Sequence, residues 1–294
     1  MRITSGMMLS DAVFNMSDAL RQMDDLQRVL SSGKAVNRPS DDPARASDVM
    51  RLQSDISRNT QFQRNTVDGM NWLQTTDGVL SSLTDLMHRA RQLAVQGANA
   101  DLPDDARQAL SNETQSLIDG AVQISQTTYA GRYIFSGTAT NTAPVTVAGA
   151  AATYNGDTAG IDREIGPGLQ ETINVTGDRL FTNAGSVMPA LFQLLGDLQA
   201  NNATAISNDI QQVDGALDAV LTARSEVGAK INRLQAAQGW QSDAETHLTD
   251  LLSTTQDADV AKTMVQLTSA ESTYRAALAV AARVLPPSLV DFLR

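Results

Sequence analysis

Two narrow apolar seams, one near each end of the chain, constrain its fold more than any other feature. Near the start, apolar side chains recur at alternating steps of four and three residues, with Gln27 filling the one polar slot. The same spacing returns near the end, where Glu271 is the one charged member. These steps are the a/d pattern of coiled-coil helices. The predicted N-terminal seam is Leu9, Val13, Met16, Leu20, Met23 and Leu30, and the predicted C-terminal seam is Val260, Met264, Leu267, Tyr274, Leu278, Ala281 and Leu285.

A stripe on one side of a helix needs a partner to cover it, so neither seam is satisfied alone. We therefore expect the two ends of the chain to pack against each other or against neighbouring copies. Between them, apolar periodicity predicts three further helical stretches, over residues 43–99, 103–130 and 187–238. Because these seams are long, they favour rods over a compact bundle.

The segment from residue 132 to 183 follows a different pattern. It is rich in Gly and Thr, and the seven-residue periodicity disappears. Asn155-Gly156 is the preferred dipeptide of a two-residue hairpin turn, and residues 170–181 alternate polar and apolar side chains as a half-exposed strand does. We expect a small β domain inserted into the helical rod.

The stretch SSGKAVNRPSDDPARAS, residues 31–47, separates two helical segments. Gly33 suits the left-handed position that ends a helix. A helix start is predicted at Ser40, Asp41, Asp42 and Pro43. Short polar side chains cap free N–H groups, and carboxylates interact favourably with the positive end of the helix dipole. Proline fits the first turn of a helix. Residues 100–108 show the same helix-start pattern, with Asp104 and Asp105 as the acidic pair. The predicted turn and cap motif is Gly33, Asn37, Pro39, Ser40, Asp41, Asp42 and Pro43.

Composition narrows the classes of function. The net charge of −11 disfavours nucleic acid and anionic membrane surfaces as partners. The absence of cysteine removes disulfides, thiolate metal sites and a cysteine nucleophile, and aromatic residues make up only 4% of the chain. No apolar run approaches the length of a membrane span, and the N-terminus does not read as a cleavable signal peptide.

No constellation of catalytic residues is evident. His88 and His247 are the only histidines, and both lie in polar helical contexts typical of solvated residues. Trp72 and Trp240 are read as core or interface packing, and Met16, Met23 and Met264 as packing rather than metal ligands. We expect no enzyme activity, no cofactor and no metal site.

Five stretches resemble the flagellin superfamily, and within it the proteins that join the flagellar hook to the filament. They are the opening MRITSGMM, the turn LSSGKAVNRPSDDPA, the helical stretch HRARQLAVQGAN, the junction GRYIFSGT and the tail ESTYRAALAVAARVLPPSLVDFLR. They occur in the family's order. Two places depart from the junction proteins' pattern: TAPVTVAG lacks their usual Pro-Phe, and the proline pair in the tail is closer to a flagellin.

The resemblance implies a mainly α fold, an elongated bundle of long helices with paired terminal coiled-coil helices and an inserted β domain. The expected segments are an N-terminal coiled-coil segment (1–40), the first half of a rod (41–131), a β domain (132–186), the second half of the rod (187–239) and a C-terminal coiled-coil segment (240–294).

The resemblance also implies a structural role in the bacterial flagellum, outside the cell, after secretion through the flagellar type III export channel without a cleaved signal. The implied partners are like subunits in a ring, the first hook-associated protein, flagellin, and an export chaperone that binds the C-terminal helix. Arg89, Leu93 and Gln96 match positions that contact neighbouring subunits in filaments, and their spacing places them on one helix face.

Two other functions stay open at this point. A short filament flagellin has the same motifs, and it differs from a junction protein in abundance and in forming long polymers. A secreted coiled-coil protein with no flagellar role explains the seams but not the motifs in their order.

Overall fold

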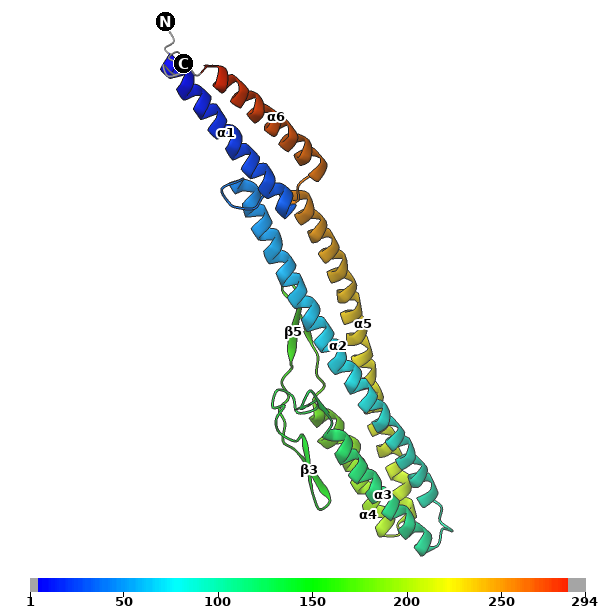
Figure 1. The fold of residues 1–294 in the computed structure, drawn as a ribbon. Coiled ribbons are helices and arrows are strands. Elements are labelled where there is room, and N and C mark those ends of the chain that lie inside the picture. The colour runs from blue at the N-terminus through cyan, green and yellow to red at the C-terminus, as the bar shows by residue number, and fades with distance from the viewer. Residues whose placement is uncertain (1–4, 285–294) are drawn as a thin grey trace. The chain divides into compact units, whose positions relative to one another are not determined.

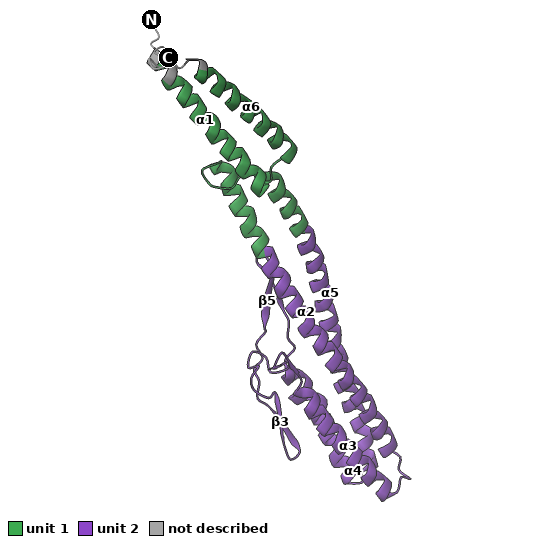
Figure 2. Ribbon diagram, in the orientation of Figure 1, with its two compact units in different colours: residues 1–58, 244–294 green, residues 59–243 purple. Residues whose placement is uncertain are grey.

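The computed structural model describes residues 5–284, which form two compact units. Of the described residues, unit 1 combines 5–58 and 244–284, near the two ends of the chain, and unit 2 is residues 59–243 (Figure 2). Helices dominate the described residues (Figure 1). They are α1 (Ser5–Ser32), α2 (Pro43–Gly97), α3 (Asp104–Ser125), α4 (Val187–Gln199), α5 (Ala203–Gln256) and α6 (Val260–Val284). The predicted mainly α fold is confirmed.

The strands form three separate antiparallel pairs rather than a larger sheet within residues 5–284. The pairs are β1 (Thr128–Tyr129) with β2 (Arg132–Tyr133), β3 (Val145–Ala148) with β4 (Ala151–Tyr154), and β5 (Asp162–Gly166) with β6 (Leu169–Thr172). Isolated pairs of this length are marginally stable alone. Their stability therefore depends on packing against the helices of unit 2.

The predicted hairpin turn at Asn155-Gly156 is wrong. The β3–β4 turn is Gly149-Ala150, because Ala148 pairs with Ala151 and Gly149 takes a φ of +63°. Asn155 instead follows β4, where its side-chain amide donates a hydrogen bond to the Thr146 hydroxyl over 3.0 Å. Glycine adopts the left-handed conformation without a steric penalty, so Gly149 serves the turn as well as an Asn-Gly pair does.

The strand predicted over residues 170–181 is also only partly correct. Its first residues lie in β6, but a π-helical turn, Asp178–Thr182, follows. In this turn Phe181 is fully buried and packs edge-to-face on Phe135, with ring centroids 5.3 Å apart. Alternation of polar and apolar residues indicates only which side chains are buried. An irregular segment that buries an aromatic side chain in the core can show the same alternation as a strand.

The stretch predicted as one helix over residues 187–238 is broken in two. α4 ends at Gln199, and Asn201 adopts a left-handed φ of +56°. The side chain of Asn202 then accepts a hydrogen bond from the Ala205 N–H over 3.1 Å and caps α5. Asparagine tolerates the left-handed region better than most residues and is a strong N-cap, so the Asn201-Asn202 pair ends one helix and begins the next.

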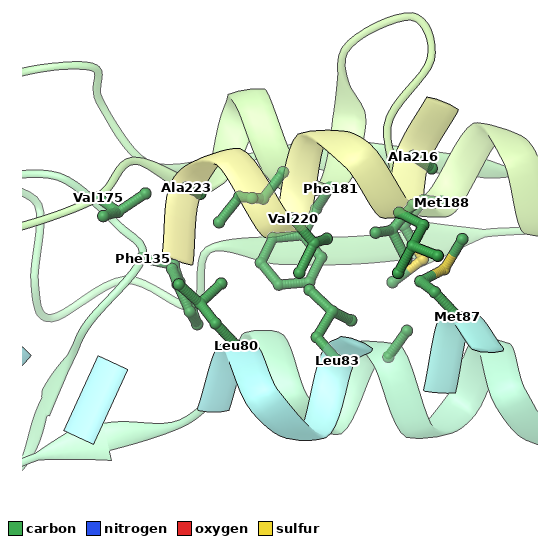
Figure 3. Packing of buried hydrophobic residues seen from close by; sticks show 14 of the residues in the cluster. Leu80, Leu83, Met87, Phe135, Val175, Phe181, Met188, Ala216, Val220 and Ala223 are labelled. Atoms are coloured by element: carbon green, nitrogen blue, oxygen red, sulfur yellow. The ribbon is translucent and has the colours of Figure 1, made fainter. Parts of the chain in front are cut away.

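The main apolar core lies in unit 2. Leu80, Leu83 and Met87 of α2 face Ala216, Val220 and Ala223 of α5, with Phe135, Phe181 and Met188 beside them (Figure 3). Gly97 permits the close approach at the end of α2, since a Cβ there would lie 2.6 Å from a methyl group of Leu198. Among the helices of residues 5–284, none combines the length and the apolar character that a membrane span requires.

Candidate assembly site

The terminal helices α1 and α6 lie side by side in unit 1 and run in opposite directions (Figure 1). The two ends of the chain thus pack against each other. The contact is lined by side chains at alternating steps of four and three residues on both helices, of which Thr263 is buried and the others are partly buried. They are Ala12, Met16, Ala19, Met23, Leu26 and Leu30 on α1, and Thr263, Leu267, Ala270, Tyr274, Ala277 and Ala281 on α6.

This contact stripe is rotated from the predicted seams. Of the predicted residues, Met16, Met23, Leu30, Leu267, Tyr274 and Ala281 are partly buried. The remaining described ones are exposed: Val13, Leu20, Val260, Met264 and Leu278. The Leu9 side chain and Leu285 lie outside what the structure describes. Sequence reasoning missed the small members of the stripe because it followed the larger apolar residues; the signal was a parallel run of alanines one position earlier.

The five exposed residues form a second apolar file, which we call the apolar flank. Val13 is 57% exposed and Met264 is 57% exposed. At 100° per residue, Val13 and Leu20 lie on one side of the α1 stripe, and Val260, Met264 and Leu278 lie on the corresponding side of the α6 stripe. In an antiparallel pair of right-handed helices, corresponding sides coincide. The apolar flank therefore lies on one face of the helix pair, where Gln27 of α1 and Glu271 of α6 interrupt it.

The opposite side of the pair confirms this geometry. One groove there is lined jointly by Ala19, Gln22, Asp25 and Leu26 of α1 and by Gln266, Ser269, Ala270 and Thr273 of α6. Ala19, Leu26 and Ala270 belong to the contact stripe, and the other five residues lie on the side of it away from the apolar flank. The helix pair thus has two unlike faces, a largely polar groove and the apolar flank.

A backbone clasp joins the two ends of the chain at the base of the helix pair. The N–H groups of Ala35 and Val36 donate to the carbonyl oxygen of Gln256, over 2.7 and 3.4 Å, and the Ala258 N–H donates to the Gly33 carbonyl over 2.9 Å. Gly33 takes a φ of +70° and its N–H donates to the Val29 carbonyl, so it ends α1 as predicted. The turn motif therefore fixes where α6 begins relative to α1.

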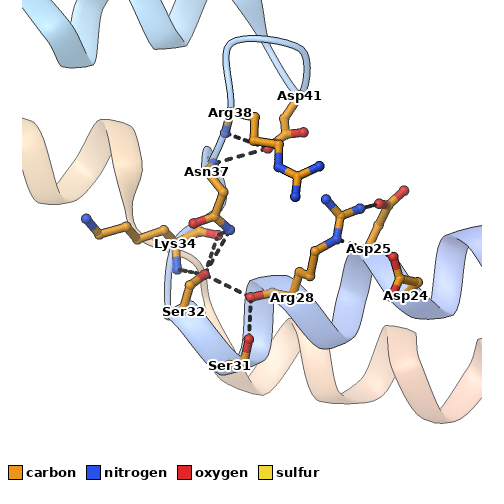
Figure 4. A network of polar contacts seen from close by, with 9 residues as sticks. All are labelled: Asp24, Asp25, Arg28, Ser31, Ser32, Lys34, Asn37, Arg38 and Asp41. Carbon is orange, nitrogen blue, oxygen red and sulfur yellow. Dashed lines mark hydrogen bonds and ion pairs between the residues drawn. The ribbon is translucent and has the colours of Figure 1, made fainter.

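The two aspartates of the motif, Asp41 and Asp42, have different hydrogen-bond partners, one in the turn and one in the helix. Asp42 caps α2, because its Oδ1 accepts the N–H groups of Ala44 and Arg45, each over 3.1 Å. Asp41 instead accepts the N–H groups of Arg38 over 2.8 Å and Asn37 over 3.2 Å (Figure 4). Its predicted role as a helix cap is thus wrong. Pro39 and Ser40 lie exposed in the turn before Asp42.

The polar network around this turn also includes α1. The Asn37 amide donates to the Ser32 hydroxyl over 2.8 Å and to the Lys34 carbonyl over 3.2 Å (Figure 4). Arg28 pairs with Asp25. The Arg38 N–H, followed by the Asn37 N–H and the charge of Arg28, lowers the pKa of the Asp41 carboxyl below its ordinary value. The carboxylate form thus stabilises the turn that carries the clasp.

The three residues of the predicted contact face on α2, Arg89, Leu93 and Gln96, differ in their exposure to solvent. Leu93 is fully buried in unit 2, whereas Arg89 and Gln96 are exposed. Arg89 pairs with Glu113 of α3 over 2.6 Å. Leu93 supports the helix from inside and does not belong to a solvent-facing surface, because its apolar neighbours already cover it.

The other residues considered for chemistry are dispersed. His88 and His247 are exposed on separate helices, and residues 5–284 contain no group of three or more candidate metal ligands. Trp72 is buried in the core as predicted, but Trp240 is 67% exposed. The arrangement of the described residues provides surfaces for packing.

Comparison with known proteins shows which family this chain resembles. Residues 3–140 match the family model of the bacterial flagellin N-terminal helical region. The predicted resemblance to the flagellin superfamily is confirmed. This flagellin-like chain is 26% identical over 305 residues to the flagellar hook-associated protein 3 of Escherichia coli strain K12, covering 94% of this chain and 96% of the relative.

Filament proteins are similar to this flagellin-like chain as well. It is 26% identical over 291 residues to a flagellin of Halalkalibacterium halodurans, covering 95% of both chains. In fold it resembles the crystal structure of flagellar hook-associated protein 3 from Legionella pneumophila, with a TM-score of 0.65, 17% identity, and coverage of 70% of this chain and 98% of that one. At that identity the likeness supports the fold alone.

Proposed function

We propose that the chain is a structural subunit of the bacterial flagellum that joins the hook to the filament, and that copies assemble through the apolar flank of the α1–α6 pair. The observation that carries the proposal is the exposure of five apolar side chains on one side of a helix pair whose own contact stripe is elsewhere. Isolated exposed apolar residues are ordinary, but several of them gathered on one face mark an interaction surface. Each side chain contributes on the order of 1 kcal/mol when a neighbour covers its exposed part.

The like subunits form a ring in this proposal, with the first hook-associated protein on one side and flagellin on the other. The hook-associated relatives favour this position over a filament role, although flagellins match over the same length. We also propose that an export chaperone covers α6 before secretion without a cleaved signal, because α6 carries most of the apolar flank.

Substitutions on the two faces of the helix pair test the assembly surface. Leu20→Glu and Met264→Glu place charges on the apolar flank, and Gln22→Glu and Gln266→Glu place the same side chain on the opposite groove. We expect the first two variants to remain folded by circular dichroism and to fail in assembly, and the second two to assemble. If both sets assembled equally, the apolar flank would not be the contact surface.

A deletion strain separates the junction role from the filament role. Cells lacking the chain should carry complete hooks without filaments and shed flagellin into the medium, as seen by electron microscopy and by analysis of the medium. Hooks that still bear filaments would contradict the junction role. Long polymers grown from the purified chain alone would favour a filament flagellin.

A further inference from the structure

Trp240 of α5 is a large aromatic side chain that unit 2 leaves in solvent. It is 67% exposed, whereas the other tryptophan of the chain, Trp72, is 2% exposed. Ala236 and Asp243, one turn to either side of Trp240, are exposed as well. An indole ring carries a large apolar area, and tryptophan is enriched at protein interfaces. We call the surface of Ala236, Trp240 and Asp243 the tryptophan face.

A groove of about 480 Å³ lies on α2 in the same unit, and its lining includes Arg64, Val67, Asn71 and Tyr129. Val67 is 39% exposed, and the ring of Tyr129 is fixed edge-to-face on Trp72, with ring centroids 5.7 Å apart. Arg64 is exposed and donates one hydrogen bond, to the Gln61 side chain over 2.6 Å, which leaves further guanidinium donors for a partner. The groove thus combines apolar surface with a cation, and both suit an aromatic ring.

The tryptophan face and this groove lie on opposite sides of the α2–α5 pair. Thr66 and Gln241 mark where the two helices face each other, because their side chains are hydrogen-bonded over 2.8 Å. At about 100° per residue, Val67 and Asn71 point to one side of the pair, and Trp240 points to the other. Trp240 therefore does not reach the groove of its own chain, but it can reach the groove of a neighbouring copy.

The two surfaces also lie at the same level along the helix pair. Gln241 is level with Thr66, and Leu234 is close to Gly69, since a Cβ at Gly69 would lie 3.4 Å from a methyl carbon of Leu234. Residue numbers thus fall along α5 as they rise along α2. By the same count, Trp240 is level with Val67, and Ala236 is level with Asn71.

We infer that Trp240 of one copy occupies the groove on α2 of the next copy in the ring. The inference rests on the ring of the proposed function. Rotation about a ring axis keeps every residue at its height and repeats one contact between two unlike surfaces at each boundary. Two surfaces on opposite sides and at one level meet this requirement when the helix pair stands along the axis.

The charges of the two surfaces are complementary as well. Arg64 lies in the groove, and Asp243 lies one turn from Trp240. In the contact, the indole ring packs on Val67 and Tyr129 and against the Arg64 guanidinium, which is attracted to the face of the ring. All of these residues belong to unit 2, so the contact is separate from the apolar flank.

Two engineered cysteines test the contact inside the assembled flagellum, because the chain contains no cysteine of its own. Ala236→Cys and Asn71→Cys in one chain place the thiols on opposite sides, so they meet only between copies. Flagella isolated from cells that carry this double variant are oxidised and run on denaturing gels. We expect a ladder of oligomers beyond the dimer, with about tenfold more linked chain than in the control pair of Ala236→Cys with Ala100→Cys. Ala100 is an exposed position in the α2–α3 connection.

Single-cysteine variants distinguish this contact from a symmetric one. Ala236→Cys alone and Asn71→Cys alone should give no more dimer than Ala100→Cys alone, because unlike surfaces meet. Strong dimer formation by either single variant, or no ladder in flagella that contain the double variant, would overturn the inference and leave the proposed function standing. Absence of the unchanged chain from isolated flagella would instead contradict the proposed function, and with it the ring on which the inference rests.

Trp240→Ala in the chain without added cysteines tests the side chain itself. Because Trp240 is exposed, circular dichroism should show an unchanged fold, while the amount of chain in isolated flagella should fall by about tenfold. Leu221→Ala, a truncation at another exposed residue of α5, should leave this amount unchanged. Equal amounts of the two variants in flagella would show that Trp240 does not make the contact.

Discussion

The side-chain amide of Gln241 donates a hydrogen bond to the hydroxyl of Thr66 over 2.8 Å, between α5 and α2, where both side chains are buried. The same nitrogen donates to the carbonyl oxygen of Ile165 in β5 over 2.7 Å. The main-chain carbonyl of Gln241 accepts a further bond from the Asn59 amide over 2.8 Å. A single residue of α5 thus holds α2 and the β5–β6 hairpin in place.

Gln241→Ala should lower the free energy of unfolding by about 1–3 kcal/mol, because the Ile165 carbonyl and the Thr66 hydroxyl lose a buried donor. Urea unfolding measures the loss, and hydrogen exchange should show faster opening of β5 and β6. Gln235→Ala, the same change at an exposed position of α5, is the control. Equal stability of the two variants would contradict the role of Gln241.

The stability of unit 2 should depend on pH through Asp209. This residue of α5 is 2% exposed and faces Asp197 of α4, and burial together with the charge and hydrogen bond of Asp197 raises its pKa to about 7. In the unfolded chain the pKa is close to the ordinary value of about 3.9. Between these values the folded chain binds more protons, so the free energy of unfolding falls as the pH rises, by at most about 1.4 kcal/mol per pH unit.

Asp209→Asn should remove this slope, because the amide keeps the shape of the side chain and carries no charge. Denaturant unfolding at a series of pH values between about 4 and about 7 checks the prediction. Asp218→Asn, at an exposed position of α5, should keep the slope of the unchanged chain. If the free energy of unfolding of Asp209→Asn still fell with rising pH, a group other than Asp209 would be responsible.

Loss of the α2 cap should weaken unit 1. Asp42→Ala removes the acceptor of the Ala44 and Arg45 N–H groups and should cost about 1 kcal/mol. Hydrogen exchange at the start of α2 measures the local effect. Asp48→Ala, further along α2 and exposed, should have little effect, and an equal loss in both variants would argue against the cap.

Deletion of residues 260–294 should leave a folded, soluble subunit that does not assemble. α1 loses its contact stripe in this variant, and an isolated amphipathic helix is marginal in water. Circular dichroism should therefore show a larger loss of helix than the deleted residues account for. A truncated chain that polymerised or capped hooks normally would show that α6 is not needed for assembly.

Periodicity predicted where helices occur, because burial on one side of a helix imposes its spacing on the sequence, but it did not reveal the break between α4 and α5. It was not sufficient to choose between two neighbouring stripes on α1. The pairing surface uses Ala12 and Ala19, which permit close approach, while Val13 and Leu20 are larger and therefore more conspicuous in the sequence. Which stripe is buried within one chain depends on the partner helix, so the alanines of α1 become decisive only when the small residues of α6 that face them are known.

Residue preferences for helix ends and turns gave correct predictions where a backbone conformation favours one residue type. Gly33 ends α1 and Asp42 caps α2 because their backbone positions require those residues. The signals failed where several conformations suit the same residues: Asp41 serves the turn instead of the helix, and Asn155 does not form the hairpin turn. The alternating burial that ends at Phe181 likewise fits both a strand and an irregular turn.

Unit 1 is built from both ends of the polypeptide, and this fixes the order in which a chain emerging from its N-terminus can fold. The contact stripe of α1 stays uncovered until α6 follows, whereas unit 2 is continuous in sequence and complete much earlier. A subunit that is threaded out in this direction therefore acquires its terminal helix pair last. If copies join through the apolar flank as proposed, this contact would form only after the whole chain has emerged, so premature association would not compete with export.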